Sequence, residues 1–525
     1  MLDVYLLHVG FEISLAYRCL EGYARRDPRI DAEVRFFRRE LRMEQFMATG
    51  LRVNDFAPFS ESERALAELR ERRPAVLGVS CYIWNSTAML TFCQRAKALV
   101  PDLLVVAGGP DVGNRPEDVL QRWPAVDVVV QGEAEETFAE LLRLMLDGRR
   151  DALAGLAGTT TRGEDGALVR GPWRPPLENL DLIPSPYDDE LDREDPALSR
   201  YDRSVVYETL RGCVFDCAFC LYGQTRHRKF DDQRVIRDLS RLVSAGYDVQ
   251  VVDPIFGLNK KRTKVILEAL AALEAPGGLR IESYAELLDR ETAELYKRAN
   301  VKQIGLGLQT IEEESLQEMD RRFKLERFQE NLAHLDDLEL EYYVDVIYGL
   351  PKSDYQGFRR TIDFVLGSFP HADIEIYRLL ALPGTRYHAE ADKYGLAFSP
   401  EPPYETYGCE TFSYEDIMRA HRVAHVYKML RGGLRQVWRL SAVWKRHYDG
   451  SAVAFLEDFA DWLEQSRVLD FLSTHALTET SFLLNSKLAE FLEARGYARV
   501  EDEPSSGAPT PPEPADRRSQ PGVIA

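Results

Sequence analysis

Short apolar runs alternate with amphipathic stretches along the first 150 or so residues. The runs with β-strand character are Leu2–His8, Ala32–Phe37, Val76–Ser80, Leu103–Ala107 and Asp127–Gln131. Stretches with helical spacing separate them, for example Glu61–Arg72 and Thr137–Leu146. Strands that alternate with helices in this way predict a parallel sheet with helices on both faces, which is a doubly wound, flavodoxin-like α/β domain over residues 1–150.

Aromatic residues and paired glycines follow three of these strands. Because ligands of doubly wound sheets bind beyond the carboxyl ends of the strands, we take these positions as a candidate binding site. They are Ser80, Tyr82, Trp84, Gly108, Gly109, Gly132 and Glu133. Paired glycines let the backbone approach a flat, bulky ligand closely. The alternative is that the glycines only form tight turns between strand and helix.

A second series of strands and helices follows a Pro-rich stretch, residues 151–200, which we interpret as a linker with a hairpin around Gly163–Gly166. The apolar runs are Val205–Leu210, Asp248–Asp253, Leu279–Tyr284, Gln303–Leu308, Tyr342–Tyr348 and Asp373–Leu380. Each is followed by a helical pattern, so the chain predicts a partial (β/α)6 barrel over residues 201–388. The chemistry of such barrels takes place at the carboxyl ends of the strands.

The remainder of the chain divides into a helical part and a tail. Residues 389–500 are expected to form a mostly helical C-terminal domain, in which Ser413 and Asp416 cap a helix. Residues 501–525 are rich in Pro, Ser and Gly and are expected to be disordered.

The charge balance narrows the class of partner. There are 66 Lys and Arg residues against 86 Asp and Glu residues, a formal net charge of −20, which disfavours nucleic acid or an anionic membrane. A basic run at Arg226–Lys229 is interpreted as a solvated or anion-facing patch. No apolar stretch is long enough to span a bilayer, and no signal-peptide pattern precedes the first strand, so we expect a cytoplasmic protein.

Three cysteines, Cys213, Cys217 and Cys220, lie within eight residues directly after the first strand of the second series. A [4Fe–4S] cluster normally takes four Cys ligands, so a loop with three leaves one iron open to a small molecule. The alternative is a zinc site, for which His227 or Cys409 would have to supply the fourth ligand. The other cysteines are interpreted as small buried residues: Cys19, Cys81, Cys93 and Cys409.

The Cys213-x3-Cys217-x2-Cys220 spacing resembles the signature of the radical S-adenosylmethionine (SAM) enzymes. The resemblance implies that the three cysteines hold a [4Fe–4S] cluster, whose open iron chelates SAM, and that Phe219 lies near the adenine. It also places Asp253 at the amino group of SAM and Glu282 or Tyr284 at the ribose. Gly305, Gly307 and Gln309 resemble the segment that lines the adenine. The alternative for each is packing inside the barrel.

The first domain, placed before this loop, resembles the cobalamin-binding domain of one subgroup of radical SAM enzymes. The segments that carry this resemblance most clearly are Val-Val-Ala-Gly108-Gly109-Pro and Val-Gln-Gly132-Glu133. Many cobalamin domains carry Asp-x-His-x-x-Gly after the first strand, but His8 lacks both the Asp and the Gly. We therefore expect cobalamin bound without a protein His on its lower face.

The resemblance implies reductive cleavage of SAM and, with cobalamin on the same chain, methyl transfer to an unactivated carbon or to phosphorus of a small molecule or peptide. An external electron donor of the flavodoxin or ferredoxin type would reduce the cluster. Two alternatives remain open at this point. One is a ring-forming or rearrangement enzyme with the same cofactors, and the other is a non-catalytic cobalamin or cluster sensor.

Overall fold

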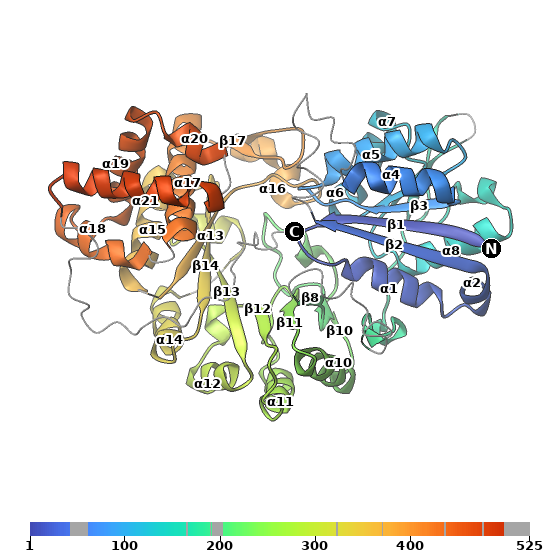
Figure 1. The fold of residues 1–525 in the computed structure, drawn as a ribbon, viewed down its shortest axis with the longest axis horizontal. Coiled ribbons are helices and arrows are strands. Elements are labelled where there is room, and N and C mark those ends of the chain that lie inside the picture. The colour runs from blue at the N-terminus through green and yellow to red at the C-terminus, as the bar shows by residue number, and fades with distance from the viewer. Residues whose placement is uncertain are drawn as a thin grey trace.

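The computed structural model describes residues 1–42, 61–163, 166–188, 191, 203–321, 324–369, 371–434, 437–474 and 477–497. Two sheets lie side by side, each with its own helices, and a group of C-terminal helices lies at the far end of the second sheet (Figure 1). The expected disordered tail, 501–525, lies outside the described residues, as do residues 164 and 165 in the expected hairpin turn.

The first sheet has seven strands in the order β2-β1-β3-β4-β5-β6-β7. The five parallel strands are β1 (Leu2–Gly10), β2 (Val34–Arg42), β3 (Val76–Ser80), β4 (Leu104–Gly108) and β5 (Val128–Val130). The order 2-1-3-4-5 is that of flavodoxin-like folds. The doubly wound architecture predicted for the first part of the chain is therefore confirmed.

Helices cover both faces of this sheet because successive strand residues point to opposite sides. Tyr5 and Leu7 of β1 belong to one buried apolar cluster, and Val4 and Leu6 to another. The first cluster includes residues of α4 (Glu61–Arg72), α5 (Ser86–Leu99) and α7 (Pro116–Arg122). The second includes residues of α1 (Leu15–Ala24), α2 (Pro28–Glu33) and α8 (Glu135–Leu146). A short helix, α6 (Pro110–Gly113), follows β4.

A hairpin extends the first sheet beyond β5. Strands β6 (Thr159–Arg162) and β7 (Leu168–Arg170) add to the edge in antiparallel fashion. Part of the stretch interpreted as a linker is therefore a structural part of the first sheet.

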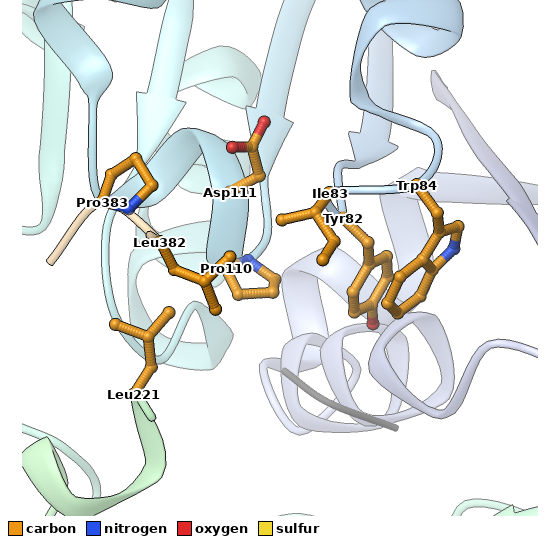
Figure 2. A pocket seen from close by; sticks show the side chains of 8 residues that line it. All are labelled: Tyr82, Ile83, Trp84, Pro110, Asp111, Leu221, Leu382 and Pro383. Atoms are coloured by element: carbon orange, nitrogen blue, oxygen red, sulfur yellow. The ribbon is translucent and has the colours of Figure 1, made fainter. Parts of the chain in front are cut away.

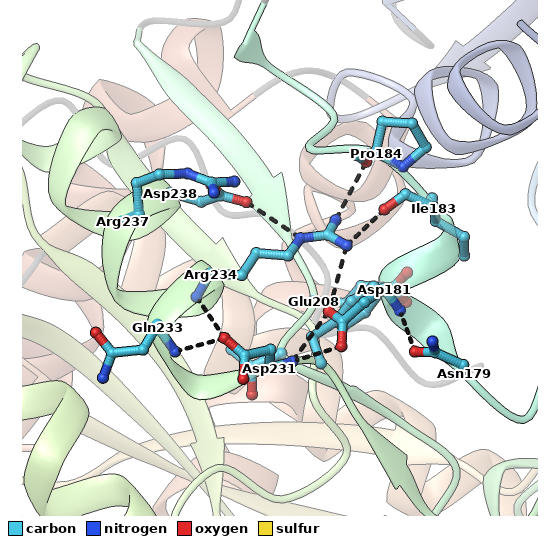
Figure 3. A network of polar contacts seen from close by, with 12 residues as sticks. Asn179, Asp181, Ile183, Pro184, Glu208, Asp231, Gln233, Arg234, Arg237 and Asp238 are labelled. Carbon is cyan, nitrogen blue, oxygen red and sulfur yellow. Dashed lines mark hydrogen bonds and ion pairs between the residues drawn. The ribbon is translucent and has the colours of Figure 1, made fainter. Parts of the chain in front are cut away.

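The chain that leads from this hairpin to the second sheet is fixed to a barrel helix, α10 (Asp232–Ser244) (Figure 3). Arg234 donates hydrogen bonds to the carbonyl oxygens of Ile183 and Pro184. The backbone N–H of Asp231 donates to Asp181 Oδ1 at 3.0 Å. The connection between the two sheets is thus held at residues 181–184 by polar contacts.

The second sheet has six strands in the order β15-β14-β13-β12-β11-β8, all parallel. They are β8 (Ser204–Tyr207), β11 (Asp248–Val251), β12 (Leu279–Ser283), β13 (Val301–Gln309), β14 (Tyr342–Tyr348) and β15 (Asp373–Arg378). The helices between them are α10, α11 (Lys260–Ala271), α12 (Arg290–Arg298), α13 (Glu313–Glu318), α14 (Leu325–Asp337) and α15 (Tyr355–Ser368). The predicted partial (β/α)6 barrel is confirmed, with β8 and β15 at its two edges.

The C-terminal helices pack against the barrel. They are α16 (Arg386–Ala389), α17 (Tyr414–Leu434), α18 (Ser441–His447), α19 (Ala452–Gln465), α20 (Leu469–Thr474) and α21 (Leu477–Ala494), and a small hairpin, β16 (Ala397–Phe398) and β17 (Thr406–Gly408), precedes α17. Buried residues of α17, α19 and α21 belong to the same apolar core as the barrel strands. The expected cap of α17 is present, because Ser413 Oγ accepts a hydrogen bond from the Asp416 N–H at 3.2 Å. Among the described residues, no helix is long and apolar enough to cross a lipid bilayer.

Candidate functional site

A cavity of about 1270 Å³ lies between the two sheets. All seven positions predicted from the strand ends of the first sheet line it: Ser80, Tyr82, Trp84, Gly108, Gly109, Gly132 and Glu133. The opposite wall comes from the barrel and from residues next to the three-cysteine loop, including Glu208, Arg211, Leu221, Tyr222 and Tyr377. The tertiary structure therefore brings the candidate binding edge of the first sheet and the surroundings of the cysteine loop to one cavity.

Aromatic and aliphatic side chains meet where the domains touch beside this cavity (Figure 2). The rings of Tyr82 and Trp84 are stacked, with centroids 4.6 Å apart and an interplanar angle of 8°. Leu221, which directly follows the last cysteine of the loop, and Leu382 from the barrel lie on the other side of a narrow apolar gap. The stacked rings present a flat surface of the kind that suits a large planar ligand.

The loop that carries these rings is held in place by the chain itself. Asn85, which is 1% exposed, donates hydrogen bonds from Nδ2 to the carbonyl oxygens of Val9 and Ser80 at 2.7 and 3.2 Å. Its Oδ1 accepts from the Tyr82 N–H at 2.7 Å. The binding loop is thus preorganised by one buried amide that joins two neighbouring strands.

Two of the glycines are required for different reasons. Gly109 has φ of +109°, and a Cβ there would lie 2.5 Å from the Cys81 carbonyl oxygen, so only glycine fits. Gly108 has no such constraint, since a Cβ would meet Val130 Cβ at an ordinary 3.8 Å. Gly108 therefore keeps the cavity open, whereas Gly109 is needed for the turn.

His8 lies at the edge of the cavity, as its place near the end of the first strand predicts. Its Nε2 lies 3.0 Å from the Glu12 carbonyl oxygen and donates to it, while Nδ1 has no partner among the described residues. Burial lowers the pKa of His8, so the ring is neutral.

Glu133 also lines the cavity, but its carboxylate turns towards the barrel. Burial alone would raise its pKa, but Arg228 and Arg211 hold the pKa below its ordinary value. Arg228 belongs to the basic run noted in the sequence and is buried, so this part of the run faces an anion of the chain itself. Arg226, in contrast, is exposed and pairs with Glu178 on the surface.

The three cysteines lie on the loop after β9 (Leu210–Arg211), at the mouth of the barrel. Cys213 Sγ accepts a hydrogen bond from the Phe215 N–H at 3.5 Å, and Cys217 Sγ lies 3.8 Å from Arg321 Nη1. Burial raises the pKa of Cys220 to about 11, with a further contribution from the neighbouring thiols of Cys213 and Cys217. No three Cys, His, Asp or Glu side chains of the described residues are grouped as a metal centre. The ligand role of these cysteines stays a prediction that rests on their spacing along the chain.

Phe219 and Asp253, two residues proposed to contact SAM, have partners within the chain. Phe219 is buried in an apolar cluster with Leu316, Met319 and Tyr387. Asp253 is 1% exposed and accepts hydrogen bonds from the N–H and hydroxyl of Thr209 and from the Leu210 N–H. Asp253 thus braces the strand that leads into the cysteine loop.

The other residues proposed to contact SAM, Glu282, Gly305, Gly307 and Gln309, face the inside of the barrel. They belong to two rows of side chains that run across neighbouring strands. In register, Gly305 pairs with Glu282 and Tyr343, and Gly307 pairs with Asp345. Residues paired across neighbouring strands share a face of the sheet. A Cβ on Gly305 would lie 2.2 Å from Glu282 Oε2, so this glycine makes room for the hydrogen bond from the Tyr343 hydroxyl to Glu282.

Several polar atoms around these rows have no partner among the described residues. They are Gln309 Oε1, Arg321 Nε and Asp345 Oδ1. Burial raises the pKa of Glu282 to about 7 and also raises that of Asp345, with a further contribution from neighbouring carboxylates. Buried polar groups are normally hydrogen-bonded, so this part of the barrel has the character of a binding site for a polar ligand.

Comparison with known proteins separates the chain into two recognised domains. Residues 43–142 match the family model for the B12 binding domain, and residues 207–365 match that for the Radical SAM superfamily. The chain therefore carries a B12-binding domain followed by a radical SAM domain. The resemblance drawn from the motifs is confirmed, and so are cobalamin, SAM and an iron–sulfur cluster as the cofactors that these domain types serve.

Two curated relatives are similar to about two thirds of the chain. The cobalamin-dependent radical SAM methyltransferase TokK of Streptomyces tokunonensis is 29% identical over 368 residues, which are 66% of this chain and 52% of the relative. A 2-(S-pantetheinyl)-carbapenam-3-carboxylate methyltransferase of Streptantibioticus cattleyicolor is 31% identical over 353 residues, 63% of this chain and 51% of that protein. The chain thus spans about half the length of these relatives.

Solved structures show the same fold. The cobalamin-dependent radical SAM enzyme OxsB, with aqua-cobalamin bound, superposes with a TM-score of 0.65 at 14% identity and covers 94% of this chain and 81% of OxsB. The radical SAM methyltransferase TsrM from Kitasatospora setae, with cobalamin and a [4Fe–4S] cluster, gives a TM-score of 0.57 at 18% identity, with 77% and 78% covered. At these identities the likeness concerns the fold.

The residues present fit the cofactors that the two domain types serve. Gly108 and the stacked rings of Tyr82 and Trp84 line one cavity, which suits a bulky planar corrinoid. The unpartnered Gln309 Oε1 and Arg321 Nε suit a polar ligand such as SAM at the mouth of the barrel.

Three residues of the site were not singled out from the sequence. Asn85 follows the aromatic pair, Arg211 directly precedes Gly212-Cys213, and Asp345 lies in the middle of a strand. The position of Arg211, directly before the cysteine loop, could have identified it as a residue of the site. The role of Asn85 was not visible, because it bonds to Val9, 76 residues away.

Proposed function

We propose that this chain is a cobalamin-dependent radical SAM methyltransferase that acts on an unactivated carbon, or on phosphorus, of a small molecule or peptide. The observation that carries the proposal is the cavity of about 1270 Å³, which is bounded both by the glycine-rich edge of the B12-binding domain and by residues next to the cysteine loop. Such a shared space lets a methyl group pass between two cofactors without meeting water.

When bound, the cofactors supply the one-electron cleavage of SAM and a methyl-carrying corrinoid, and the protein supplies binding and orientation. Cys213, Cys217 and Cys220 hold the cluster in this proposal. The first domain positions the corrinoid through the backbone of Gly108 and Gly109, and through the other strand-end residues: Ser80, Tyr82, Trp84 and Gly132. The stacked rings exclude water from its edge.

The barrel residues hold SAM. We assign Gly305, Gly307 and Gln309 to the adenine and Glu282 to the ribose, since they surround the unpartnered polar atoms of the barrel mouth. Phe219 keeps its proposed place near the adenine through the apolar cluster in which it is buried. Asp253 acts by holding the base of the cysteine loop.

The names of the relatives favour a small-molecule acceptor. One relative is named as a methyltransferase of a carbapenam carboxylate. Another is a hopanoid C-3 methylase from Methylococcus capsulatus, which is 26% identical over 306 residues. Other relatives are named as anaerobic magnesium-protoporphyrin IX monomethyl ester cyclases, for example that of Rubrivivax gelatinosus. Ring formation therefore remains the second candidate. An external electron donor of the flavodoxin or ferredoxin type completes the proposal.

The test begins with protein prepared without oxygen, in which corrinoid and iron are measured for the wild type, Cys213→Ala and Gly108→Trp. We expect about one corrinoid and about four irons in the wild type. Each variant should lose only its own cofactor, because Gly108 has no strained backbone and a larger side chain there enters the cavity.

The products formed from SAM then separate the candidate functions. With titanium(III) citrate as the reductant, we expect 5′-deoxyadenosine together with S-adenosylhomocysteine. 5′-Deoxyadenosine without S-adenosylhomocysteine would support ring formation or rearrangement instead. The absence of both products, with both cofactors bound, would support a sensor and refute the enzyme.

A further inference from the structure

The base of the cysteine loop carries two arginines that face each other. Strands β9 (Leu210–Arg211) and β10 (Arg228–Lys229) form a short antiparallel ladder in which Arg211 is the register partner of Arg228. Like charges directly opposite each other destabilise a ladder. These two guanidinium groups are also poorly exposed, at 14% for Arg211 and 6% for Arg228. The base of the loop therefore needs buried anions beside it.

The B12-binding domain supplies most of those anions. Arg228 forms a two-pronged ion pair with Glu133, with one contact of 3.1 Å between Nη1 and Oε2. Arg211 Nη1 lies 3.4 Å from the same Glu133 oxygen, and Arg211 Nη2 lies 2.7 Å from Glu135 Oε1. The barrel adds Glu208, 2.7 Å from Arg211. Two of the three carboxylates that neutralise the loop base thus come from the other domain.

The ion-paired group formed by Glu133, Glu135, Arg211 and Arg228 lies next to a proposed cofactor site at each of its two ends. Glu133 directly follows Gly132, which lines the cavity with φ of +70°. Arg211 precedes Gly212, where φ is +80° and a Cβ would lie 2.3 Å from the Thr225 carbonyl oxygen, so the chain enters the loop at Cys213 in a fixed direction. The ion cluster consequently joins the corrinoid loop to the cysteine loop over a few residues.

We propose that Glu133 and Glu135 form, with Arg211 and Arg228, an interdomain clamp that sets the position of the corrinoid relative to the cluster. Glu133 is accordingly a positioning residue. The carboxylate already accepts hydrogen bonds from Arg228 and from the Leu177 N–H, the latter at 3.2 Å, and forms an ion pair with Arg211. This inference rests on the proposed function for its catalytic consequence, but the clamp itself is testable in protein without cofactors.

The test compares Glu133→Gln with Glu136→Gln as a matched control. Glu136 lies three residues along the chain, and its side chain is 40% exposed and away from the two arginines. Hydrogen exchange is measured in the cofactor-free proteins over residues 131–136 and 208–213. We expect faster exchange in both segments of Glu133→Gln and no change in Glu136→Gln, because only the former releases the loop base.

The second readout is the ratio of two products from SAM in the reconstituted proteins, with titanium(III) citrate as the reductant. 5′-Deoxyadenosine requires only the radical SAM domain. S-Adenosylhomocysteine arises when the methyl group of SAM passes to the reduced corrinoid. Its formation therefore requires that the two domains are correctly placed relative to each other. We expect Glu133→Gln to retain corrinoid and iron while the ratio of S-adenosylhomocysteine to 5′-deoxyadenosine falls by roughly 100-fold, as for a misplacement of about 1 Å.

A variant of the arginine partner sharpens the test. Arg228→Lys keeps the charge but not the two-pronged geometry, so its ratio should lie between those of the wild type and Glu133→Gln. If the groups act as a unit, Glu133→Gln combined with Arg228→Gln should lower the ratio no further than Glu133→Gln alone. If Glu133→Gln fails to fold, Glu133→Asp, which keeps the charge with a shorter reach, is read in the same way.

The outcomes separate the clamp from the proposed function. Loss of corrinoid from Glu133→Gln with unchanged exchange at 208–213 would mean that Glu133 holds the corrinoid directly, and an unchanged ratio would also overturn the clamp. If the wild type forms no S-adenosylhomocysteine, the methyltransferase proposal fails. The exchange data alone then decide: faster exchange in both segments supports the clamp, and equal exchange refutes it.

Discussion

The two binding edges of this molecule are built in opposite ways. At the edge of the first sheet, the missing side chain of Gly108 leaves space for a ligand, and Gly109 allows the turn that follows. The polar atoms there that have no partner among the described residues are ring nitrogens, His8 Nδ1 and Trp84 Nε1. In the barrel, the corresponding atoms belong to ionisable or amide groups such as Arg321, Asp345 and Gln309.

The difference follows from the ligands that the two edges suit. A large planar ligand is bound mostly by contact area, so the chain needs an open, rigid surface and few charges. A small polar ligand is bound by hydrogen bonds, so the chain must keep buried donors and acceptors unsatisfied until the ligand arrives, at a cost in stability. The first edge should therefore be sensitive to steric changes, and the barrel to changes of charge.

The largest effect is expected at the cysteine loop, which belongs to the barrel side of the comparison. Cys217→Ala should remove the iron and lower 5′-deoxyadenosine formation at least roughly 1000-fold. Cys409→Ala is the matched control and should keep both, since Cys409 is expected to be a packing residue. Iron analysis and product assays check this, and loss of metal from Cys409→Ala would restore the zinc alternative.

A steric change at the first edge should come next. Gly109→Ala places a Cβ 2.5 Å from the Cys81 carbonyl oxygen at φ of +109°, which should cost at least about 2 kcal/mol. Gly108→Ala makes only an ordinary contact and should change stability by less than about 0.5 kcal/mol. Chemical unfolding of both variants measures the difference. Equal stabilities would show that the turn at Gly109 tolerates a side chain.

Asp253→Asn tests whether this buried carboxylate braces the chain or contacts SAM. The amide oxygen can still accept from the Thr209 and Leu210 N–H groups, which share one oxygen of Asp253. The new NH2 group then faces the Thr209 hydroxyl, which now donates to Asp253 and accepts from Arg262, at a cost of about 1–3 kcal/mol. We expect lower thermal stability and a KM for SAM within about threefold of wild type. A stable variant with a much higher KM for SAM would support the first prediction, in which Asp253 contacts the amino group of SAM.

The smallest effect concerns Glu282 and pH. Because burial raises its pKa to about 7 from an ordinary 4.5, the folded protein holds a proton there that the unfolded chain releases, and stability falls as the pH rises from 4.5 to 7. Glu282→Gln removes that loss. Its Tm should therefore exceed that of wild type by roughly a few degrees at pH 8 and by less at pH 5.

Thermal scans of cofactor-free protein at the two pH values measure this difference. Glu291→Gln, on an exposed ion pair with Lys264, is the control and should show little dependence on pH. A Glu282→Gln effect that does not change with pH would mean that packing, and not charge, determines the role of this side chain.

Much of the fold was predictable from the sequence, because the apolar periodicity of each strand is a local signal. Leu2–His8 and Tyr342–Tyr348, for example, correspond to β1 (Leu2–Gly10) and β14 (Tyr342–Tyr348). The hairpin of β6 and β7 was visible only as a turn. Its attachment to β5 depends on pairing between distant residues, such as Val129 with Thr160, which a local pattern does not encode.

The candidate site was predictable to the same extent. The strand-end glycines pointed to the edge of the first sheet that lines the cavity, since loops at the carboxyl ends of parallel strands necessarily share one side of their sheet. The cysteine spacing predicted a second binding edge at the barrel, which stays a prediction. The sequence did not reveal that Glu133 faces Arg228, 95 residues away, or that Asp253 accepts hydrogen bonds from Thr209. Such partners are chosen by packing between elements.

The sequence by itself determined the two kinds of domain and the ligand types that they suit, because periodicity, glycine pairs and cysteine spacing act within a few residues. Only the tertiary structure decided that the edge of the first sheet and residues beside the cysteine loop line one cavity, and that Glu133 and Glu135 neutralise the arginines at the base of that loop. The physical reason is that burying a charge is costly unless an opposite charge lies beside it, and here that charge comes from a domain whose placement no local pattern specifies.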